Sequence, residues 1–367
     1  MSRTAIVGGG LAGGYAAALL ARAGARPIVL ERASEPVDKV CGEFLSAEAQ
    51  GYLREAGLGL DELGATRIDR VRVANGRRLA EARLPFTALG ISRRRLDEAL
   101  LRHAETLGAE VRRGVTVKHL EADGVDTSEG GLAAERIILA SGKHDVRGAG
   151  RESDRADWGM VGFKAYFELD PAQRRALEGA VDIVMFDGGY AGLQLVEDGR
   201  ANLCLLVREA HFATVGRTWP DLLQRLMGEP HLARRFAGAA AIKAKPLAIA
   251  RLPFGFLRRR SVGANVYPVG DQAAVTPSFT GDGMAIALHS ARLAAQAAGD
   301  DAGSDRYLAR LRADLGRPVR LACWLQRRAE TWPGRAVTVA AFACFPPLLA
   351  QIARATRVPG RALERAA

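Results

Sequence analysis

A glycine-rich turn near the start of the chain has the residue types and spacing of a nucleotide site. Thr4–Val7 favours a β-strand, and Gly8, Gly10 and Gly13 follow it in the pattern Gly-x-Gly-x-x-Gly. Glycines at these places permit a tight turn, a close approach of the backbone to a pyrophosphate, and close packing of helix on strand. Residues 11–23 then have helical composition, and the first N–H groups of a helix attract phosphate. The unit predicts dinucleotide binding; a glycine-rich turn without a ligand is the alternative.

An acidic residue lies where a nucleotide site of this kind needs one. Residues 27–30 favour a second strand that ends in Glu31, 31 − 13 = 18 residues after the last glycine. This distance is close to the ~20 residues at which a carboxylate accepts hydrogen bonds from ribose hydroxyls. We therefore predict that Glu31 and the adjacent Arg32 contribute to the nucleotide site.

A second glycine-rich segment lies in the last third of the chain. Residues 265–269 favour a strand, Gly270 and Asp271 follow it, and residues 276–284 lead into an alanine-rich helix. A second helix therefore begins at a turn that can face a ligand. Taken alone, Asp271 is better explained as a capping or turn aspartate.

The two segments together resemble the FAD-dependent family that includes aromatic hydroxylases of the para-hydroxybenzoate hydroxylase type and geranylgeranyl reductases. The resemblance implies that the Gly-Asp pair binds the ribityl chain of the flavin and that the proline-containing loop lies against the isoalloxazine ring. It assigns cofactor binding to six residues here: Gly270, Asp271, Pro277, Gly281, Gly283 and Met284.

Two further segments match this family in part. Arg93 precedes Asp97 by four residues, and the resemblance implies that Arg93 lies near the flavin phosphates or ribityl chain. A solvated arginine cluster explains it equally well. Asp145 lies in a segment that resembles the Asp-Gly segment of the family, so it too is expected to position the cofactor. Val146 stands where glycine is usual.

The loop of residues 39–46 resembles the Cys-Gly-Glu loop of geranylgeranyl reductases, which lies near the flavin and the substrate. We predict Cys41 and Glu43 as catalytic residues. Cys41 could donate a proton or touch the substrate, and Glu43 could orient either. The alternative is a buried cysteine at a junction of loop and helix.

Composition excludes several other classes of protein. The net charge is +11, from 52 basic and 41 acidic residues, but the basic residues are scattered, so no nucleic-acid partner is predicted. The four cysteines have no metal-ligand spacing, which predicts no metal site and fits the reducing cytoplasm. No stretch reaches the ~20 apolar residues of a membrane span. The apolar C-terminal stretch is expected to be core, with weak peripheral membrane contact as the minor alternative.

The order of the elements predicts an α/β fold. We expect a Rossmann-like FAD-binding domain with a parallel sheet, interleaved with an antiparallel-sheet substrate domain and followed by a helical C-terminal region. The predicted FAD-binding domain comprises residues 1–150 and 250–300, and residues 60–90 are candidates to join the substrate domain. The substrate domain is expected over residues 151–249, because strand-like runs there follow one another without helices between them. Residues 301–367 form the predicted helical region.

These features predict an FAD-dependent oxidoreductase. A second complete glycine pattern is absent, so NADH or NADPH is expected to visit only transiently as electron donor. The function ranked first is a monooxygenase that hydroxylates an aromatic or polyketide-like small molecule through a flavin C4a-hydroperoxide. The alternative is a geranylgeranyl-reductase-like enzyme that reduces C=C bonds of an apolar isoprenoid-type substrate. A non-enzymatic protein that binds prenyl groups is the third hypothesis.

Overall fold

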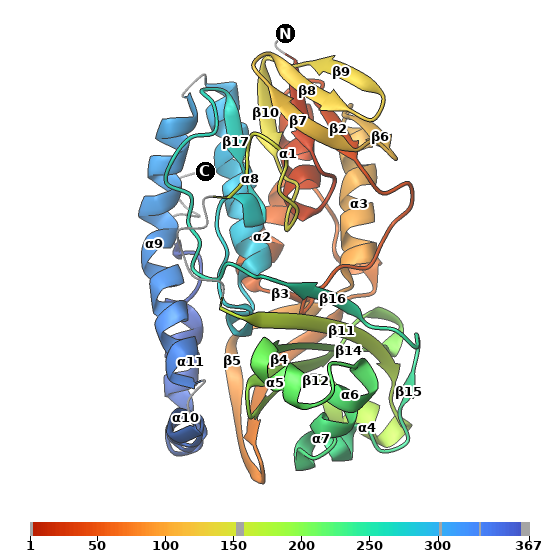
Figure 1. Ribbon diagram of the computed structural model, residues 1–367, viewed down its shortest axis with the longest axis vertical. Helices are drawn as coiled ribbons and strands as arrows, with labels where there is room; N and C mark the ends of the chain where they lie inside the picture. The colour runs from red at the N-terminus through yellow and green to blue at the C-terminus, as the bar shows by residue number, and fades with distance from the viewer. Residues whose placement is uncertain (1–2, 152–157, 301–302, 330–331, 361–367) are drawn as a thin grey trace.

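The computed structural model of the chain describes residues 3–151, 158–300, 303–329 and 332–360. Three sheets organise these residues: a five-stranded sheet, a nine-stranded sheet and a small three-stranded sheet. Figure 1 shows the five-stranded sheet with its helices above the large sheet, and long C-terminal helices along one side of both. The predicted mixed α/β fold with a helical C-terminal region is confirmed.

The five-stranded sheet is parallel throughout, in the order β17-β10-β1-β2-β6. All four residues of β1 are buried, as expected for a strand covered on both faces. The helices α3 and α8 each pack against α1 beside this sheet. The bounds are β1 Thr4–Val7, α1 Leu11–Arg22, β2 Ile28–Glu31, α3 Arg93–Thr106, β6 Glu110–Arg113, β10 Arg136–Leu139, β17 Val266–Pro268 and α8 Gly283–Gly299.

The nine-stranded sheet follows the order β15-β11-β14-β13-β12-β4-β5-β3, with β16 paired to β11. It is antiparallel except that β12 and β4 are parallel, which departs from the predicted antiparallel sheet at one pair. The strands are β3 Phe44–Leu45, β4 Thr66–Asn75, β5 Arg78–Gly90, β11 Met160–Glu168, β12 Gly179–Phe186, β13 Gly189–Leu195, β14 Ala201–Arg208, β15 Ala240–Ala241 and β16 Leu247–Ala250.

The alternation along β11 gives the large sheet two different faces. Phe163, Ala165 and Phe167 belong to a core that includes residues of the helices on the far side of the sheet. Lys164 and Tyr166 lie between them in sequence and therefore point to the opposite face, toward the five-stranded sheet. The helices of the far side are α4 Pro171–Leu177, α5 Glu209–Thr214, α6 Trp219–Leu226 and α7 Pro230–Arg235.

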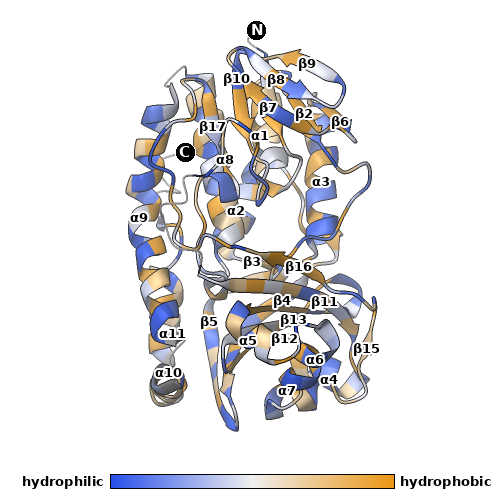
Figure 2. Cartoon of the chain, viewed as in Figure 1, coloured by the Kyte–Doolittle hydropathy of each residue, from blue (hydrophilic) through white to orange (hydrophobic). Residues whose placement is uncertain are grey.

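The remaining elements complete the outside of the molecule. Figure 2 shows hydrophobic residues concentrated on the strands of the five-stranded sheet and a mixed pattern along α9. The elements are α2 Ala47–Glu55, β7 Val117–Glu121, β8 Gly124–Thr127, β9 Gly130–Ala133, α9 Gly303–Ala329, α10 Trp332–Cys344 and α11 Pro346–Ala355. Helices α10 and α11 pack on β5. Among the helices described, none has both the length and the apolar character to cross a membrane.

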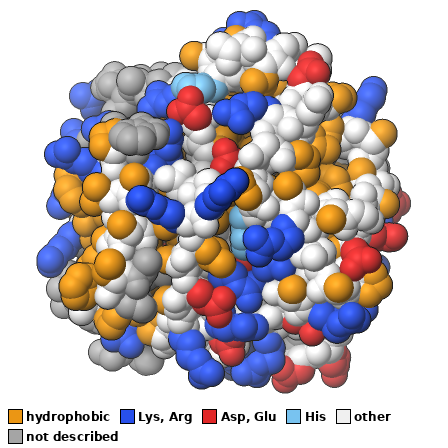
Figure 3. Space-filling view, turned by 90° about the horizontal axis from the view of Figure 1, so that it is seen from below, with side chains coloured by type: hydrophobic (Ala, Val, Ile, Leu, Met, Phe, Trp, Pro, Cys, Tyr) orange, Lys and Arg blue, Asp and Glu red, His pale blue; other side chains and the backbone are white. Residues whose placement is uncertain are grey.

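The C-terminal helices also carry exposed apolar side chains. Trp324, Val337 and Phe345 are each more than half exposed, whereas Phe342 is buried against β4 and β5. In the view from below, hydrophobic side chains gather on the side where α10 and α11 lie, and basic side chains are spread over the rest of that face (Figure 3). Part of the apolar stretch is therefore core, as expected, and part is surface.

Candidate functional site

The first glycine-rich turn has a geometry that only glycine permits. Gly8 adopts φ +104°, and a Cβ atom there would lie 2.5 Å from the carbonyl oxygen of Ala140. A Cβ atom on Gly13 would lie 1.9 Å from the carbonyl oxygen of Gly8, so helix and turn are in direct contact. Gly10 is the N-cap of α1 and provides no side-chain cap. The start of α1 is thus an uncapped helix end, which suits a pyrophosphate.

Two cations lie beside this helix end. The Cβ position of Gly10 is 3.2 Å from Nζ of Lys39 and 3.5 Å from Nη2 of Arg93. Asp97 holds both, accepting from Lys39 Nζ at 2.8 Å and from Arg93 Nε at 2.8 Å. Burial opposes the charged form of Asp97, but the charges of Arg93 and Lys39 outweigh burial and lower the pKa of this carboxyl. Arg93, which the sequence singled out, and Lys39, which sequence reasoning missed, therefore both lie beside the start of α1.

Glu31 ties the turn to the end of β2. Its Oε2 accepts the N–H of Gly9 at 2.6 Å, and its Oε1 accepts the N–H of Ala33 at 2.9 Å. A carboxylate oxygen accepts more than one hydrogen bond, so the half-buried Glu31 can still receive a ribose hydroxyl. Arg32 is exposed and its Nη2 lies 2.8 Å from Nε2 of His144.

The second glycine-rich segment forms another uncapped helix start. Gly270 has φ +59°, and its N–H donates to Oγ of Ser290 in α8 at 2.9 Å. Asp271 is half-buried in the short 3-10 turn that follows. Asp282, the N-cap of α8, makes no side-chain cap bond, and a Cβ atom on Gly283 would meet nothing within 4 Å. Open space therefore lies in front of the helix start.

The loop before α8 borders that space. Pro277 and Met284 are buried, and Oγ1 of Thr276 is buried without a hydrogen-bond partner among the described residues. Gly281 has φ +68°, and a Cβ atom there would lie 2.9 Å from the ring of Phe44. Two uncapped helix starts, a buried hydroxyl without a partner and glycines that leave room fit the pyrophosphate and the flavin of FAD.

Asp145 is exposed and links the two turns indirectly. Its Oδ1 accepts from Nε of Arg151 at 2.9 Å and from Nε2 of Gln272 at 3.1 Å. Gln272 also donates to the carbonyl oxygen of Gly142 at 2.8 Å. Gln272 has no exposed surface and directly follows Asp271, so it fixes the loop after β10 against the second turn. Sequence reasoning missed Gln272 because its partners lie in another part of the chain.

The loop of residues 39–46, called the Cys41 loop below, joins the two turns to the large sheet. Glu43 adopts φ +60°, which is uncommon for a residue with a side chain. Its carboxylate is completely buried and accepts from the backbone N–H of Arg93 at 2.7 Å and from Tyr166 Oη at 2.8 Å. It also forms an ion pair with Lys164. Glu43 therefore has no surface left for a substrate, and its role is to anchor the loop.

Polar side chains of the large sheet hold the backbone of the same loop. Gln194 Nε2 donates to the carbonyl oxygen of Glu43 at 2.8 Å. Asn202 Nδ2 donates to the carbonyl oxygens of Gly42 at 2.9 Å and Cys41 at 3.2 Å. The strands β11, β13 and β14 thus each supply an anchor. The alternation of side chains along each strand indicates which face these polar residues occupy. The sequence alone does not indicate which loop they contact.

Cys41 and Gly42 form the accessible end of this anchored loop. Cys41 is half-buried, its Sγ accepts the N–H of Glu43 at 3.3 Å, and Gly42 is exposed. Arg93 interacts electrostatically with Cys41, so a positive charge is close to the thiol. Cys204 lies on the sheet beneath, where burial raises the pKa of its thiol to about 12. Burial thus disfavours the thiolate of Cys204, whereas Cys41 has a cation beside its thiol.

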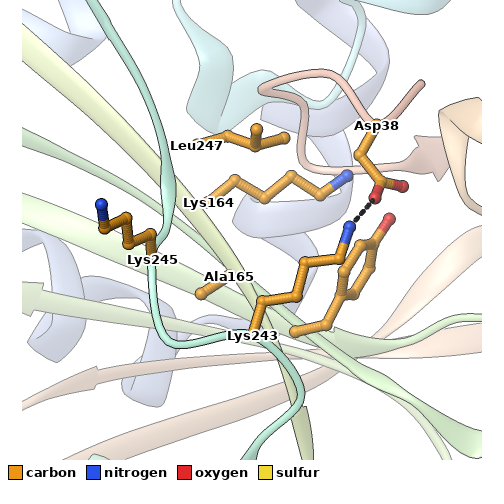
Figure 4. Close-up of a pocket in the computed structure, with 7 residues that line it drawn as sticks. Asp38, Lys164, Ala165, Lys243, Lys245 and Leu247 are labelled. Atoms are coloured by element: carbon orange, nitrogen blue, oxygen red, sulfur yellow. Dashed lines mark hydrogen bonds and ion pairs between the residues drawn. The ribbon is translucent and has the colours of Figure 1, made fainter.

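Lysines gather around the same loop, although the chain has only six of them. Lys143 Nζ donates to the carbonyl oxygen of Val40 at 2.7 Å, and Lys164 Nζ donates to that of Lys39 at 3.1 Å. A small cavity beside the loop is lined by Lys164, Lys243 and Lys245, and Lys243 pairs with Asp38 at 3.2 Å (Figure 4). The loop thus lies in a positive environment. No cluster of potential metal ligands occurs among the described residues.

Comparison with known proteins is consistent with a flavin site. Residues 1–134 match the family model described as the FAD binding domain. A menaquinone reductase of Mycobacterium tuberculosis is 28% identical over 314 residues, which cover 79% of this chain and 75% of that protein. Digeranylgeranylglycerophospholipid reductase 2 of Methanopyrus kandleri is 27% identical over 352 residues, covering 86% of this chain and 84% of that protein.

Solved structures share the fold at low sequence identity. The myxobacterial chondrochloren halogenase, described as an FAD-dependent halogenase, superimposes with a TM-score of 0.77 at 19% identity. The match covers 100% of this chain and 95% of that one. At this identity the likeness concerns the fold.

Proposed function

We propose that this chain, which belongs to the superfamily of FAD-dependent oxidoreductases, reduces a carbon–carbon double bond of an apolar, isoprenoid-type substrate. The observation that carries the proposal is the Cys41 loop. The buried Glu43 fixes one end of the loop, and Cys41 and Gly42 form its accessible end. Phe44, which follows Glu43, lies against Gly281 of the second turn. We propose that the thiol faces the substrate at this end of the cofactor site.

We assign the following roles in this reaction to residues of the chain. Bound FAD supplies the hydride, and the carbon that does not receive hydride needs a proton. We propose that Cys41 holds this proton at its Sγ atom, and that the adjacent Arg93 stabilises the thiolate once the proton has left. The space beside Gly42 is open to the substrate chain, since a Cβ atom there would meet nothing within 4 Å.

Binding of the cofactor would use the two uncapped helix starts. The N–H groups at the start of α1, with Arg93 and Lys39, would face the pyrophosphate, and Glu31 would accept from the ribose. Asp271 and the loop of Pro277 to Gly283 would hold the ribityl chain and the ring. We propose NADH or NADPH as the donor that reduces the cofactor.

Hydroxylation, which the sequence alone ranks first, becomes the second candidate. The order changes because two relatives are named as reductases and because the anchored cysteine loop supplies a proton donor that hydroxylation does not need. A binder of prenyl groups without flavin chemistry is the third candidate.

Analysis of products distinguishes these candidates. The purified protein is loaded with FAD, reduced without oxygen, and mixed with a polyprenyl quinone or a geranylgeranyl lipid. We expect reoxidation of the flavin and a product whose prenyl chain gains two hydrogen atoms; a gain of two hydrogen atoms in the quinone ring alone would contradict the proposed reduction of a C=C bond. A product that gains one oxygen atom, formed only after oxygen is admitted and from a phenolic substrate, would establish hydroxylation instead. A protein that takes up no FAD would contradict both enzymatic functions.

A further inference from the structure

The last described segment of the chain returns to the start of α8. Thr356, Arg357 and Val358 follow α11 and are all buried. The N–H of Val358 donates to Oδ2 of Asp282 at 3.0 Å. Nη1 of Arg357 lies 3.5 Å from Oδ1 of Asp282 and 3.3 Å from Oε2 of Glu48 in α2. The C-terminal segment is therefore fixed on the N-cap residue of α8.

Aromatic rings hold the guanidinium of Arg357 in place. Its centre lies 4.1 Å from the ring centroid of Phe86 and 5.9 Å from that of Phe44. Phe44 is also the ring against which Gly281 packs. Arg357 thus reaches the flavin end of the site through two contacts, one with a ring beside Gly281 and one with the residue after Gly281.

Asp282 is a carboxyl group with no exposed surface between two glycines of the cofactor site. The groups that face it are Arg357 from the C-terminal segment and, from α2, Glu48 and Tyr52. One guanidinium serves two carboxylates, so the cation cannot fully compensate both. Burial raises the pKa of Asp282 to about 7; the charge of Arg357 opposes this rise and the charge of Glu48 adds to it.

We propose that Asp282 is the proton-holding group at the flavin end of the cofactor site, and that Arg357 positions it and sets its charge. The inference rests on the FAD site and not on the choice between reduction and hydroxylation. Reduction of a flavin takes up protons, so a buried carboxyl group that changes charge near neutral pH, in the turn that would hold the ring, would link that uptake to the protein. No local pattern indicates this role, because Arg357 is 75 positions from Asp282.

The test follows the flavin as a spectroscopic reporter. The FAD-loaded full chain is titrated from about two pH units below neutrality to about two above. The measured quantities are the absorbance and the fluorescence of the oxidised flavin at each pH. We expect a transition near the pKa of Asp282, about 7, in the unaltered chain, and no such transition in Asp282→Asn.

Two further variants separate a charge effect from structural damage. Arg357→Met removes the cation and is expected to raise the transition by roughly one pH unit or more, whereas Glu48→Gln removes a carboxylate and is expected to lower it. Controls are Asp300→Asn at the other end of α8 and Arg354→Met one turn before Arg357, both exposed. Both controls should titrate like the unaltered chain.

The outcomes decide the proposal even where one variant fails to fold. Shifts of opposite sign in Arg357→Met and Glu48→Gln support it, because loss of packing would not move a titration in two directions. A transition that persists in Asp282→Asn, or that stays in place in both other variants, overturns it. These readouts need no substrate, so failure of the proposed reduction would leave this result unchanged.

Discussion

The carboxylate of Glu43 and the ammonium of Lys164 form an ion pair in which neither side chain has any exposed surface. The pair joins a loop that follows the five-stranded sheet to the central part of β11 in the large sheet. It holds Glu43 at a positive φ and thereby fixes the position of Cys41 two residues earlier. The geometry of the proposed proton donor thus depends on a contact between two separate sheets.

Loss of one member of this pair should be costly. Lys164→Met leaves a buried carboxylate without its cation, and we expect the free energy of unfolding to fall by about 3–5 kcal/mol. The double variant Glu43→Gln with Lys164→Met should recover part of the loss, because it leaves no buried charge. Urea unfolding of the FAD-loaded chain measures both. Lys243→Met, at a 68% exposed side chain, is the matched control and should change stability by about 0–1 kcal/mol.

Cys41 should be the cysteine that turnover needs. If its thiol provides the proton, Cys41→Ser lowers kcat by roughly 10²–10⁴-fold and leaves FAD binding nearly unchanged. The exposed Cys344 offers the control variant Cys344→Ser, which should keep full activity. Equal activity of the two variants would rule out the proposed role. If Cys41→Ser instead loses FAD, the loop has a structural role in cofactor binding and the proposed role of the thiol is contradicted.

The contact between Gly13 and Gly8 should be essential for FAD. Gly13→Ala places a methyl group 1.9 Å from a carbonyl oxygen, so turn and helix must separate. We expect loss of FAD binding, measured by fluorescence titration. Gly51→Ala in α2, where a Cβ atom meets nothing within 4 Å, is the matched control and should keep FAD and gain up to about 1 kcal/mol of stability. Normal FAD binding by Gly13→Ala would contradict the assignment of the pyrophosphate site.

Asp182 should contribute to stability against acid. This buried carboxylate contacts Arg235 Nε at 2.7 Å and His231 Nε2 at 2.7 Å. Burial opposes its charge, but the hydrogen bond with His231 and the charge of Arg235 outweigh burial and lower its pKa. The group is charged in the folded protein at a pH where it is already protonated in the unfolded chain. Its stabilising effect is therefore present above the unfolded pKa of about 3.9 and lost as the pH falls through the lower folded pKa.

The free energy of unfolding as a function of pH measures this contribution. Asp182→Asn should be less stable than the unaltered chain at neutral pH, and the difference between the two should shrink in acid. Asp198→Asn removes an exposed carboxylate that pairs with Arg95, and it should follow the curve of the unaltered chain. A constant difference between Asp182→Asn and the unaltered chain at every pH would show that the pKa of Asp182 is not lowered by folding.

The elements of the first unit were predictable because their signals are local. The glycines that follow β1 and the apolar composition of α1 each describe a structure formed by neighbours in sequence, and the structure places Glu31 at the end of β2 as expected. The parallel pair β12 and β4 was not predicted. Pairing of strands so far apart depends on the whole sheet, and the two strands carry no mark of their mutual direction.

Within the site, too, residues with local signals were predictable and contacts between distant residues were not. Sequence reasoning singled out Cys41, Glu43 and Arg93 by type and spacing, and it assigned Glu43 to chemistry. The structure gives Glu43 an anchoring role, because Lys164 is 121 positions away and nothing near Glu43 in the sequence indicates that its carboxylate is enclosed. Lys39 beside Gly10 and Arg357 beside Asp282 were missed for the same reason.

The sequence by itself determined where a nucleotide could bind, since glycine geometry and free N–H groups at a helix start are properties of short segments. Only the tertiary structure decided which charges are buried, paired and able to hold a proton. Burial and electrostatic pairing depend on side chains that meet through packing, and residues such as Glu43 and Asp282 acquire their chemistry from partners in distant parts of the chain.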